Sequence, residues 1–293
     1  MDKPRVVFIR SNPVSPYPRL EKSANCLKKQ GYQVHILAWD RNNKYHEKST
    51  TLQLNDSEVE ITRFGIPGKF GGGLKSNLLP LLKFQLRILF WLIKNFKDYD
   101  VIHAYDFDTG WVAHKIAYIF NKALVYDIAD YYIDSHALVG SKIGYFVQKA
   151  ENRIINNANA VIICTEKRRQ QIVGTQPNNL TIIHNSPYLL EDDEIFTRMF
   201  RGDQEKLKMA YIGILSEGRF LEEVAEVTST RNDCEFHVAG FGNMEGKIYE
   251  LSKKNDNIFF YGRITYNETI MLESLCDLLL FLQFLFSNNH FKK

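Results

Sequence analysis

The chain has 293 residues, of which 45% are hydrophobic and 24% charged, and its formal net charge is only +3. This length accommodates one large domain or two ordinary ones, and the composition is that of a globular protein. The small net charge and the lack of a recognisable RNA- or DNA-binding motif argue against nucleic acid as a partner.

The cysteines are scattered without the spacing of metal ligands, each inside an apolar segment. They are Cys26, Cys164, Cys234 and Cys276. We therefore predict buried free thiols in a reducing compartment, and no metal site. The N-terminal segment has only four consecutive apolar residues, which favours a strand over a signal peptide and predicts a cytoplasmic protein.

The first part of the chain alternates strands and helices. We expect strands over residues 5–9, 33–38 and 59–64, a helix from Leu20 to Gly31, and a polar loop over residues 41–57. The loop after the first strand, SNPVSPYPR, contains no glycine. The dinucleotide fingerprint G-x-G-x-x-G is therefore absent, which argues against an NAD or FAD enzyme.

Residues 75–97 form an apolar stretch that polar residues interrupt. The interruptions are Pro80, Lys83, Gln85 and Arg87. Because about twenty uninterrupted apolar residues are needed to cross a bilayer, we do not expect a transmembrane span. Two interpretations stay open: a buried helix of the domain, or an interfacial helix at a membrane in which basic residues flank apolar ones. The basic residues are Lys75, Lys83, Arg87, Lys94 and Lys97, and the apolar ones include Phe84, Leu86, Leu89, Phe90 and Trp91.

The most informative stretch runs from residue 100 to residue 132. Its pattern predicts a strand, a polar loop, a helix over residues 110–120, and a second strand that opens into Asp127 and Asp130. A strand–helix–strand unit makes neighbouring parallel strands, whose carboxyl ends meet at one edge of the sheet. Ligands of open α/β sheets bind at that edge, so the acids there indicate a site.

The rest of the chain continues the alternation. We expect a helix within residues 136–157, a strand over 160–164, a helix over 166–173 and a strand over 180–184. A charged connection follows over residues 188–207. Strands near residues 208–212, 235–240, 257–262 and 277–285 then alternate with helices over 220–229, 244–254 and 267–274. This order predicts an α/β protein with two Rossmann-like domains, residues 1–190 and 206–293.

Several strings resemble the family 4 (group 1) glycosyltransferases of GT-B fold. They are RSNPVSPYPRLEKSANCLKKQGYQVHILAWDR, VIHAYDFDT, VYDIADYY, YIGILSEGRFLEEV and HVAGFGNMEGKIYELSKKNDNIFFYGRITYNETIMLESLCDLLL. The resemblance implies a retaining transferase that uses a UDP- or GDP-sugar without a metal or other cofactor. It also implies a glycan or lipid-linked acceptor, a role in surface polysaccharide or related glycan synthesis, and a location in the cytoplasm or at the inner membrane face.

The second domain carries the residues expected to bind the donor. Glycine turns, backbone N–H groups and an arginine are what a diphosphate requires. Gly213 and Arg219 lie between a strand and a helix, and Gly240 and Gly242 occupy the same position in the next unit. By the resemblance, Arg263 and Ile264 contact the base.

The first domain carries the acceptor-side candidates. Asp106 and Tyr105 are the catalytic candidates, and Arg19, Asp40, Asp108 and Asp130 are expected to bind the acceptor. The family often has histidines where Tyr105 and Ala129 stand here, so no catalytic histidine is transferred. His103 is expected to be a hydrogen-bonded core residue.

The C-terminal part departs from the family pattern. No pair of glutamates follows Asp277, and Glu222 and Glu223 stand where a phosphate-binding lysine is usual. We therefore expect a second domain that is incomplete, with a truncated and weakened donor site. The alternatives are a non-catalytic relic or membrane-associated partner, and a nucleotide-sugar epimerase of the same fold.

Overall fold

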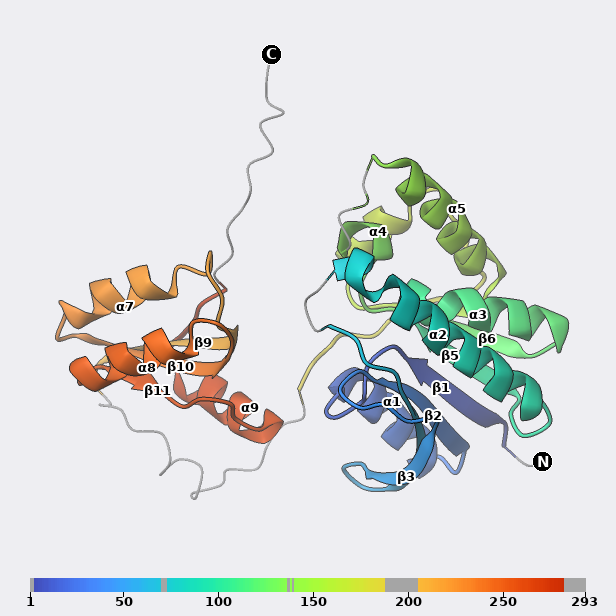
Figure 1. The fold of residues 1–293 in the computed structure, drawn as a ribbon, viewed down its shortest axis with the longest axis horizontal. Helices are drawn as coiled ribbons and strands as arrows, with labels where there is room; N and C mark the ends of the chain where they lie inside the picture. Colours follow the sequence, from blue (N-terminus) through green and yellow to red (C-terminus); the bar gives the residue numbers. More distant parts are fainter. Residues whose placement is uncertain (1–2, 70–72, 136–137, 139, 188–204, 282–293) are drawn as a thin grey trace, which may run out of the picture. The chain divides into compact units, whose positions relative to one another are not determined.

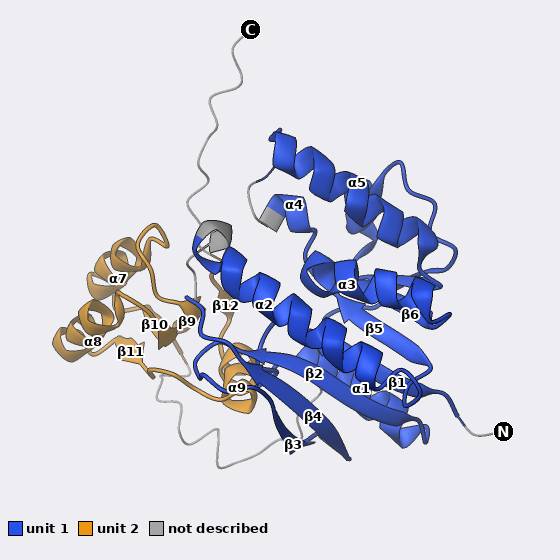
Figure 2. Cartoon of the chain, turned by 45° about the vertical axis from the view of Figure 1, so that its right-hand side comes forward, with its two compact units in different colours: residues 1–186 blue, residues 187–293 orange. Residues whose placement is uncertain are grey.

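The computed structural model describes residues 3–69, 73–135, 138, 140–187 and 205–281. The chain divides into two compact units, residues 1–186 and residues 187–293, which Figure 2 shows in different colours. Each unit has its own sheet and hydrophobic core, and each is described by itself.

Unit 1 is a sheet of order β3-β4-β2-β1-β5-β6-β7-β8, in which only the β3–β4 pair is antiparallel. The strands are β1 (Arg5–Arg10), β2 (Gln33–Asp40), β3 (Lys48–Gln53), β4 (Glu58–Gly65), β5 (Val101–Tyr105), β6 (Ala123–Ile128), β7 (Ala160–Ile163) and β8 (Leu180–Ile182). The helices are α1 (Pro18–Lys29), α2 (Gly73–Lys94), α3 (Asp106–Ile119), α4 (Tyr132–Ser135), α5 (Lys142–Asn157) and the 3-10 helix η1 (Glu166–Ile172).

The two faces of this sheet carry different cores because side chains alternate along each strand. In β1, Val7 and Ile9 pack with α2, α3 and α5, whereas Val6 and Phe8 pack on the other face with α1. Figure 1 shows α2 and α3 lying side by side on one layer. This double covering is why the central strands β1, β5 and β7 consist mostly of apolar residues.

Two expectations for unit 1 were wrong. Residues 41–57 are not wholly loop, because β3 pairs antiparallel with β4 over Lys48–Gln53. This edge strand has mostly exposed side chains and lacks an apolar pattern, so only its backbone pairing reveals it. No loop separates β5 from α3 either: the strand ends at Tyr105 and the helix begins at Asp106.

Helix α2 has a buried face and an exposed face. Phe84, Ile88 and Leu92 are fully buried, and the Phe84 ring stacks on Trp39 at 5.3 Å. The buried-helix interpretation is therefore confirmed for this side. Within the described residues, α2 is the one helix that is long and apolar enough to span a bilayer, by length and composition alone.

Unit 2 has a parallel sheet of order β11-β10-β9-β12 around a core that includes Leu215, Phe236 and Ile248. Its elements are β9 (Leu207–Ile214), α7 (Leu221–Ser229), β10 (Cys234–Phe241), α8 (Glu245–Lys254), β11 (Ile258–Phe260), α9 (Tyr266–Leu275) and β12 (Leu278–Leu279). The strand expected over residues 277–285 and the charged connection at 188–207 lie partly outside the described residues.

The burial of the cysteines agrees only partly with the expectation. None is in a disulfide, and Cys234 is buried, but Cys26 is exposed and Cys164 and Cys276 are half-buried. Cys26 lies on the outer side of amphipathic helix α1, where the apolar pattern of neighbouring residues did not distinguish it from the buried positions.

A carboxyl group lies in the core between β6 and α5. Glu151 is fully buried, and its Oε1 accepts a hydrogen bond of 2.7 Å from the hydroxyl of Tyr126. Burial raises the pKa of Glu151 to about 8 from an ordinary value of 4.5. Between these two pH values the unfolded chain releases a proton that the folded chain retains, so stability falls as the pH rises.

We expect the Glu151→Gln variant to gain stability over the wild type as the pH increases from 5 to 8. The amide oxygen can still accept from Tyr126 but has no charge to bury. The stability difference should grow by roughly 3 kcal/mol, at about 1.4 kcal/mol per unit of pKa shift. Urea unfolding at several pH values measures it, with exposed Glu226→Gln as control; a difference independent of pH would contradict the prediction.

Candidate functional site

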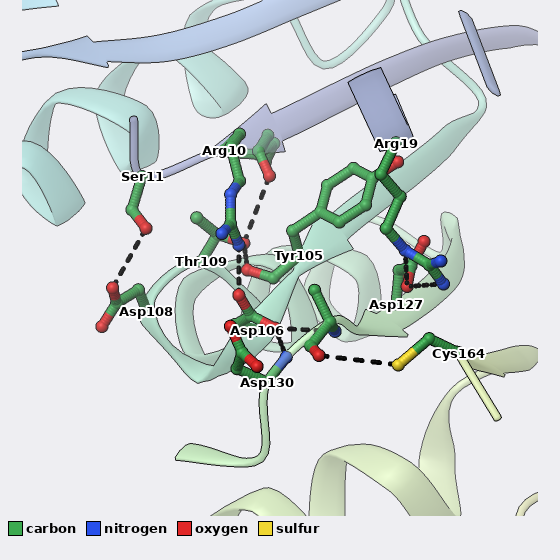
Figure 3. A network of polar contacts seen from close by, with 12 residues as sticks. Arg10, Ser11, Arg19, Tyr105, Asp106, Asp108, Thr109, Asp127, Asp130 and Cys164 are labelled. Atoms are coloured by element: carbon green, nitrogen blue, oxygen red, sulfur yellow. Dashed lines mark hydrogen bonds and ion pairs between the residues drawn. The ribbon is translucent and has the colours of Figure 1, made fainter. Parts of the chain in front are cut away.

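The carboxylate of Asp106 ties together the carboxyl ends of three strands in unit 1 (Figure 3). One oxygen forms an ion pair with Arg10 at the end of β1, and the other accepts from the backbone N–H groups of Ala129 and Asp130, at 2.9 and 3.0 Å. Burial raises the pKa of Asp106, whereas Arg10 and the Asp130 N–H oppose that shift. With all these donors we expect the group to be ionised at neutral pH.

The backbone at Asp106 explains the abrupt change from strand to helix. Its φ is +55°, a left-handed conformation that few residues other than glycine, asparagine and aspartate adopt readily. The cost of this conformation is of order 1–3 kcal/mol, and the three polar contacts of its side chain offset it. Asp106 is thereby held with 7% of its surface exposed.

Arg19 and Asp127 form a second buried pair beside the first. The guanidinium of Arg19 donates to Asp127 at 3.0 and 2.7 Å and to the carbonyl of Ile183 at 2.8 Å. His103 approaches the other Asp127 oxygen at 3.5 Å and stacks between Phe8 and Tyr105. His103 is therefore the core residue expected, and the contacts of Arg19 favour a role in joining α1 to the sheet over acceptor binding.

Tyr105 is enclosed within the same core. None of its surface is exposed, its ring meets that of Tyr17 edge-on at 5.8 Å, and burial raises its pKa well above the ordinary value. The direct catalytic roles expected for Tyr105 and Asp106 remain predictions. Their burial favours a supporting role: Asp106 holds the loop that carries Asp130, and Tyr105 packs within the core beside it.

The exposed polar groups of this edge come from Asp130 and from a neighbour that the sequence did not reveal. Asp130 is exposed, and its carboxylate lies 3.3 Å from the guanidinium of Arg168 in η1. Gln171, one turn along η1, donates to the carboxylate of Asp134 at 2.7 Å. These side chains present both donors and acceptors to solvent, as recognition of sugar hydroxyls requires.

Asp108 lies at the same edge, half-buried in the first turn of α3. Its carboxylate accepts a 3.0 Å hydrogen bond from the Ser11 hydroxyl, and the guanidinium of Arg41 donates to the Ser11 carbonyl at 3.0 Å. Within the described residues, no group of three or more His, Cys, Asp and Glu side chains is arranged to hold a metal ion.

Asp40 borders a cavity of about 460 Å³ at the end of β2. Lys44, Lys48 and Arg63 line the same cavity. The Asp40 carboxylate accepts from the Asn43 amide at 2.9 Å and the Tyr45 hydroxyl at 2.8 Å. Burial opposes ionisation of Asp40, but these hydrogen bonds outweigh it and lower its pKa. The cavity is therefore cationic on balance, with Asp40 organising its rim.

The sequence candidates of unit 2 converge at the carboxyl edge of its sheet. Gly213 pairs with Gly240 across β9 and β10, and the Gly240 N–H donates to the Gly262 carbonyl at 2.7 Å. A Cβ at Gly240 would lie 1.8 Å from the Gly213 oxygen, and one at Gly242 would lie 2.1 Å from the Leu215 oxygen. These glycines therefore allow three backbone segments to approach one another.

Cationic side chains border that edge. Arg219 lies in the turn after β9, where its charge acts on Tyr211, and Phe220 adopts a left-handed conformation immediately before α7. Arg263 stacks on the Phe241 ring at 4.0 Å. Glu222 in the first turn of α7 forms an ion pair with Lys247 of α8, so this carboxylate has a counter-ion. Ile264 follows Arg263 and is half-buried.

Asp106→Ala should destabilise unit 1, because it leaves the mostly buried Arg10 without its carboxylate partner and places alanine in a left-handed conformation. We expect a loss of about 3–5 kcal/mol, the usual cost of breaking a buried ion pair. Urea unfolding measures the loss. The control is Asp98→Ala, which removes an exposed carboxylate just beyond α2; equal stability of the two variants would contradict the assignment.

Gly240→Ala should destabilise unit 2 by about 1–3 kcal/mol or more, because the new methyl group collides with the Gly213 carbonyl at a φ of +138°. Gly246→Ala in α8 is a matched control that should change the stability in the opposite direction. It meets nothing within 4 Å, and alanine stabilises a helix by about 0.5–1 kcal/mol relative to glycine. Thermal unfolding distinguishes the two; a neutral Gly240→Ala would contradict the close approach.

A family model described as Glycosyltransferase Family 4 matches residues 20–186, which include most of α1, β5, the Asp106 turn and β6. This match covers more than half of the chain. The chain belongs to Glycosyltransferase Family 4. By this resemblance the protein is a glycosyltransferase, and its two α/β units have the architecture of the GT-B fold.

Solved structures share this fold at low sequence identity. Sucrose-phosphate synthase from Thermosynechococcus elongatus has a TM-score of 0.66 and 13% identity, over 94% of this chain and 75% of its own. Anabaena HepE in complex with UDP-glucose has a TM-score of 0.58 and 14% identity, over 94% of this chain and 73% of its own. A putative UDP-N-acetylglucosamine 2-epimerase from Listeria monocytogenes has a TM-score of 0.62 and 12% identity, over 95% of this chain and 74% of its own. At this identity the likeness shows the fold alone. A search of curated protein sequences finds no match.

Proposed function

We propose that this family 4 glycosyltransferase transfers a sugar from a nucleotide-diphosphate sugar, with a UDP- or GDP-sugar as donor. The observation that carries the proposal is the convergence of Gly213, Gly240 and Gly262 at one edge of unit 2, with Arg219 and Arg263 beside it. Backbone N–H groups and guanidinium groups at the carboxyl edge of a parallel sheet suit a diphosphate. HepE, which shares the fold, is a protein solved with UDP-glucose.

The chemistry of the proposed step is departure of the nucleoside diphosphate from the sugar. Negative charge grows on the phosphate oxygens as the bond to the anomeric carbon breaks, and positive groups positioned in advance stabilise it. Arg219 and the N-terminal N–H groups of α7 are the groups we assign to this role. In keeping with the family resemblance, we propose retention of the anomeric configuration.

The acceptor is proposed to bind at the carboxyl edge of unit 1. Exposed Asp130 and half-buried Arg168 are side chains able to hold sugar hydroxyls there, and the cavity beside Asp40 offers Lys44 and Lys48 to an anionic group of the acceptor. A glycan or lipid-linked saccharide fits this combination. We propose a role in synthesis of a surface polysaccharide or a related glycan.

Arg219→Gln should weaken UDP binding about tenfold to a hundredfold, because a hydrogen bond to a charged group contributes ~1.5–3 kcal/mol. The matched control is Arg231→Gln, since Arg231 is exposed and its ion pair is with nearby Asp233. Isothermal titration with UDP, GDP and their sugars measures the effect. Failure of the wild type to bind any of them, or equal weakening by both substitutions, would contradict the proposal.

A further inference from the structure

The outer side of α2 is an apolar stripe with no covering element among the described residues of unit 1. Its members are Leu78 (50% exposed), Leu79 (62%), Leu82 (48%), Leu86 (51%), Phe90 (65%) and Ile93 (41%). Spacings of three and four residues place them along one side of the helix. Large contiguous apolar patches are uncommon on the surface of monomeric soluble proteins, so this stripe indicates a contact surface.

The two helices that follow α2 in the same layer extend this surface. Helix α3 packs against α2 and α5 packs against α3, and Figure 2 shows the three in one layer over the sheet. Their exposed aromatic and aliphatic side chains are Trp111, Tyr118 and Ile119 on α3 and Ile143, Tyr145 and Phe146 on α5. We call these residues and the α2 stripe together the outer helical face.

The charges on the outer helical face have one sign. Lys83, Arg87, Lys94, Lys115, Lys142, Lys149 and Arg153 are exposed or half-buried on the three helices. The described side chains of α2 include no acid. The acids of α3 and α5 point inward: Asp106 and Glu151 are buried, and Asp108 is half-buried against Ser11. The face is therefore apolar, aromatic and cationic.

We propose that the outer helical face binds the surface of an anionic lipid bilayer, with α2 lying in the plane of the interface. Apolar side chains would enter the boundary between head groups and acyl chains, while the lysines and arginines contact lipid phosphates. Trp111, with the Lys115 ammonium 4.0 Å from its ring centre, has the amphipathic character that favours this depth.

The structure favours interfacial binding over a transmembrane helix. Phe84, Ile88 and Leu92 on the inner side of α2 are fully buried in the unit 1 core, and Gln85 donates to the Asp108 carbonyl of α3 at 3.1 Å. Spanning a bilayer would withdraw all of them from the core, and each large apolar side chain lost there costs about 2–5 kcal/mol. Binding through the exposed side leaves these contacts intact.

The first test is flotation of the full chain with vesicles of phosphatidylcholine alone or with one quarter phosphatidylglycerol. We expect binding to the anionic vesicles that weakens as salt is added. Replacing Lys83 and Arg87 with Gln should reduce it roughly thirtyfold at low salt, since each cation near such a surface contributes about a fivefold change. Leu86→Gln with Phe90→Gln should reduce it at least as much.

The control replaces exposed apolar side chains of unit 2, Val227→Gln with Tyr249→Gln, and should leave vesicle binding unchanged. A thermal melt checks that each variant folds, which is expected because every replaced side chain is at least partly exposed. No binding by the wild type, or equal binding by wild type and face variants, would overturn the proposal. The proposal would also be overturned if the wild type bound no vesicles but formed a concentration-dependent dimer, and Phe90→Gln dissociated that dimer.

The second test locates the contact. Vesicles with brominated acyl chains should quench the fluorescence of Trp111, and Trp111→Phe should remove most of that quenching because Trp39 is buried and Trp91 packs against His35 and Tyr99. Quenching that persists undiminished in Trp111→Phe would place the bilayer against another part of the chain and overturn the assignment. Neither readout involves a nucleotide sugar, so the outcome is independent of the proposed transferase activity.

Discussion

The geometry of unit 1 depends on the carboxylate of Asp106. It joins the end of β1 through Arg10 to the loop after β6 through two backbone N–H groups, in a conformation that most residues avoid. Because the charge is buried and fully paired, any movement of these strand ends would leave an unsatisfied ionic group. The exposed Asp130 is thereby held on a fixed loop, as its proposed role in binding the acceptor requires.

In unit 2, backbone contacts instead of a buried ion pair hold the carboxyl edge of the sheet. A Cβ at Gly240 or Gly242 would collide with the backbone at Gly213 or Leu215, and a main-chain hydrogen bond connects Gly240 to Gly262. The two edges suit different ligands. In the proposed function, carboxylate and guanidinium side chains on unit 1 bind sugar hydroxyls, whereas main-chain groups and arginines on unit 2 bind a diphosphate. This difference agrees with membership of a glycosyltransferase family.

Helix α2 carries apolar side chains on two sides. Its inner side completes the core through Phe84 and Ile88, and its outer side carries Leu86 and Phe90 in solvent. A sequence that is apolar around most of a helix reads as buried or membrane-spanning. Only the packing against β2 and α3 shows that half of that surface is available to something outside unit 1.

The sequence by itself determined the alternation of strands and helices, since long apolar runs with period 2 or 3.6 depend on local geometry. It also placed Gly213, Arg219, Gly240 and Gly242 at strand ends, because glycine patterns reflect backbone demands. The sequence did not predict edge strand β3, which has no apolar pattern. It also did not predict the pairing of Asp130 with Arg168 or the burial of Tyr105, Asp106 and Arg19. Whether a polar side chain faces solvent or an ion pair depends on residues up to about a hundred positions away, and only the tertiary structure decides that.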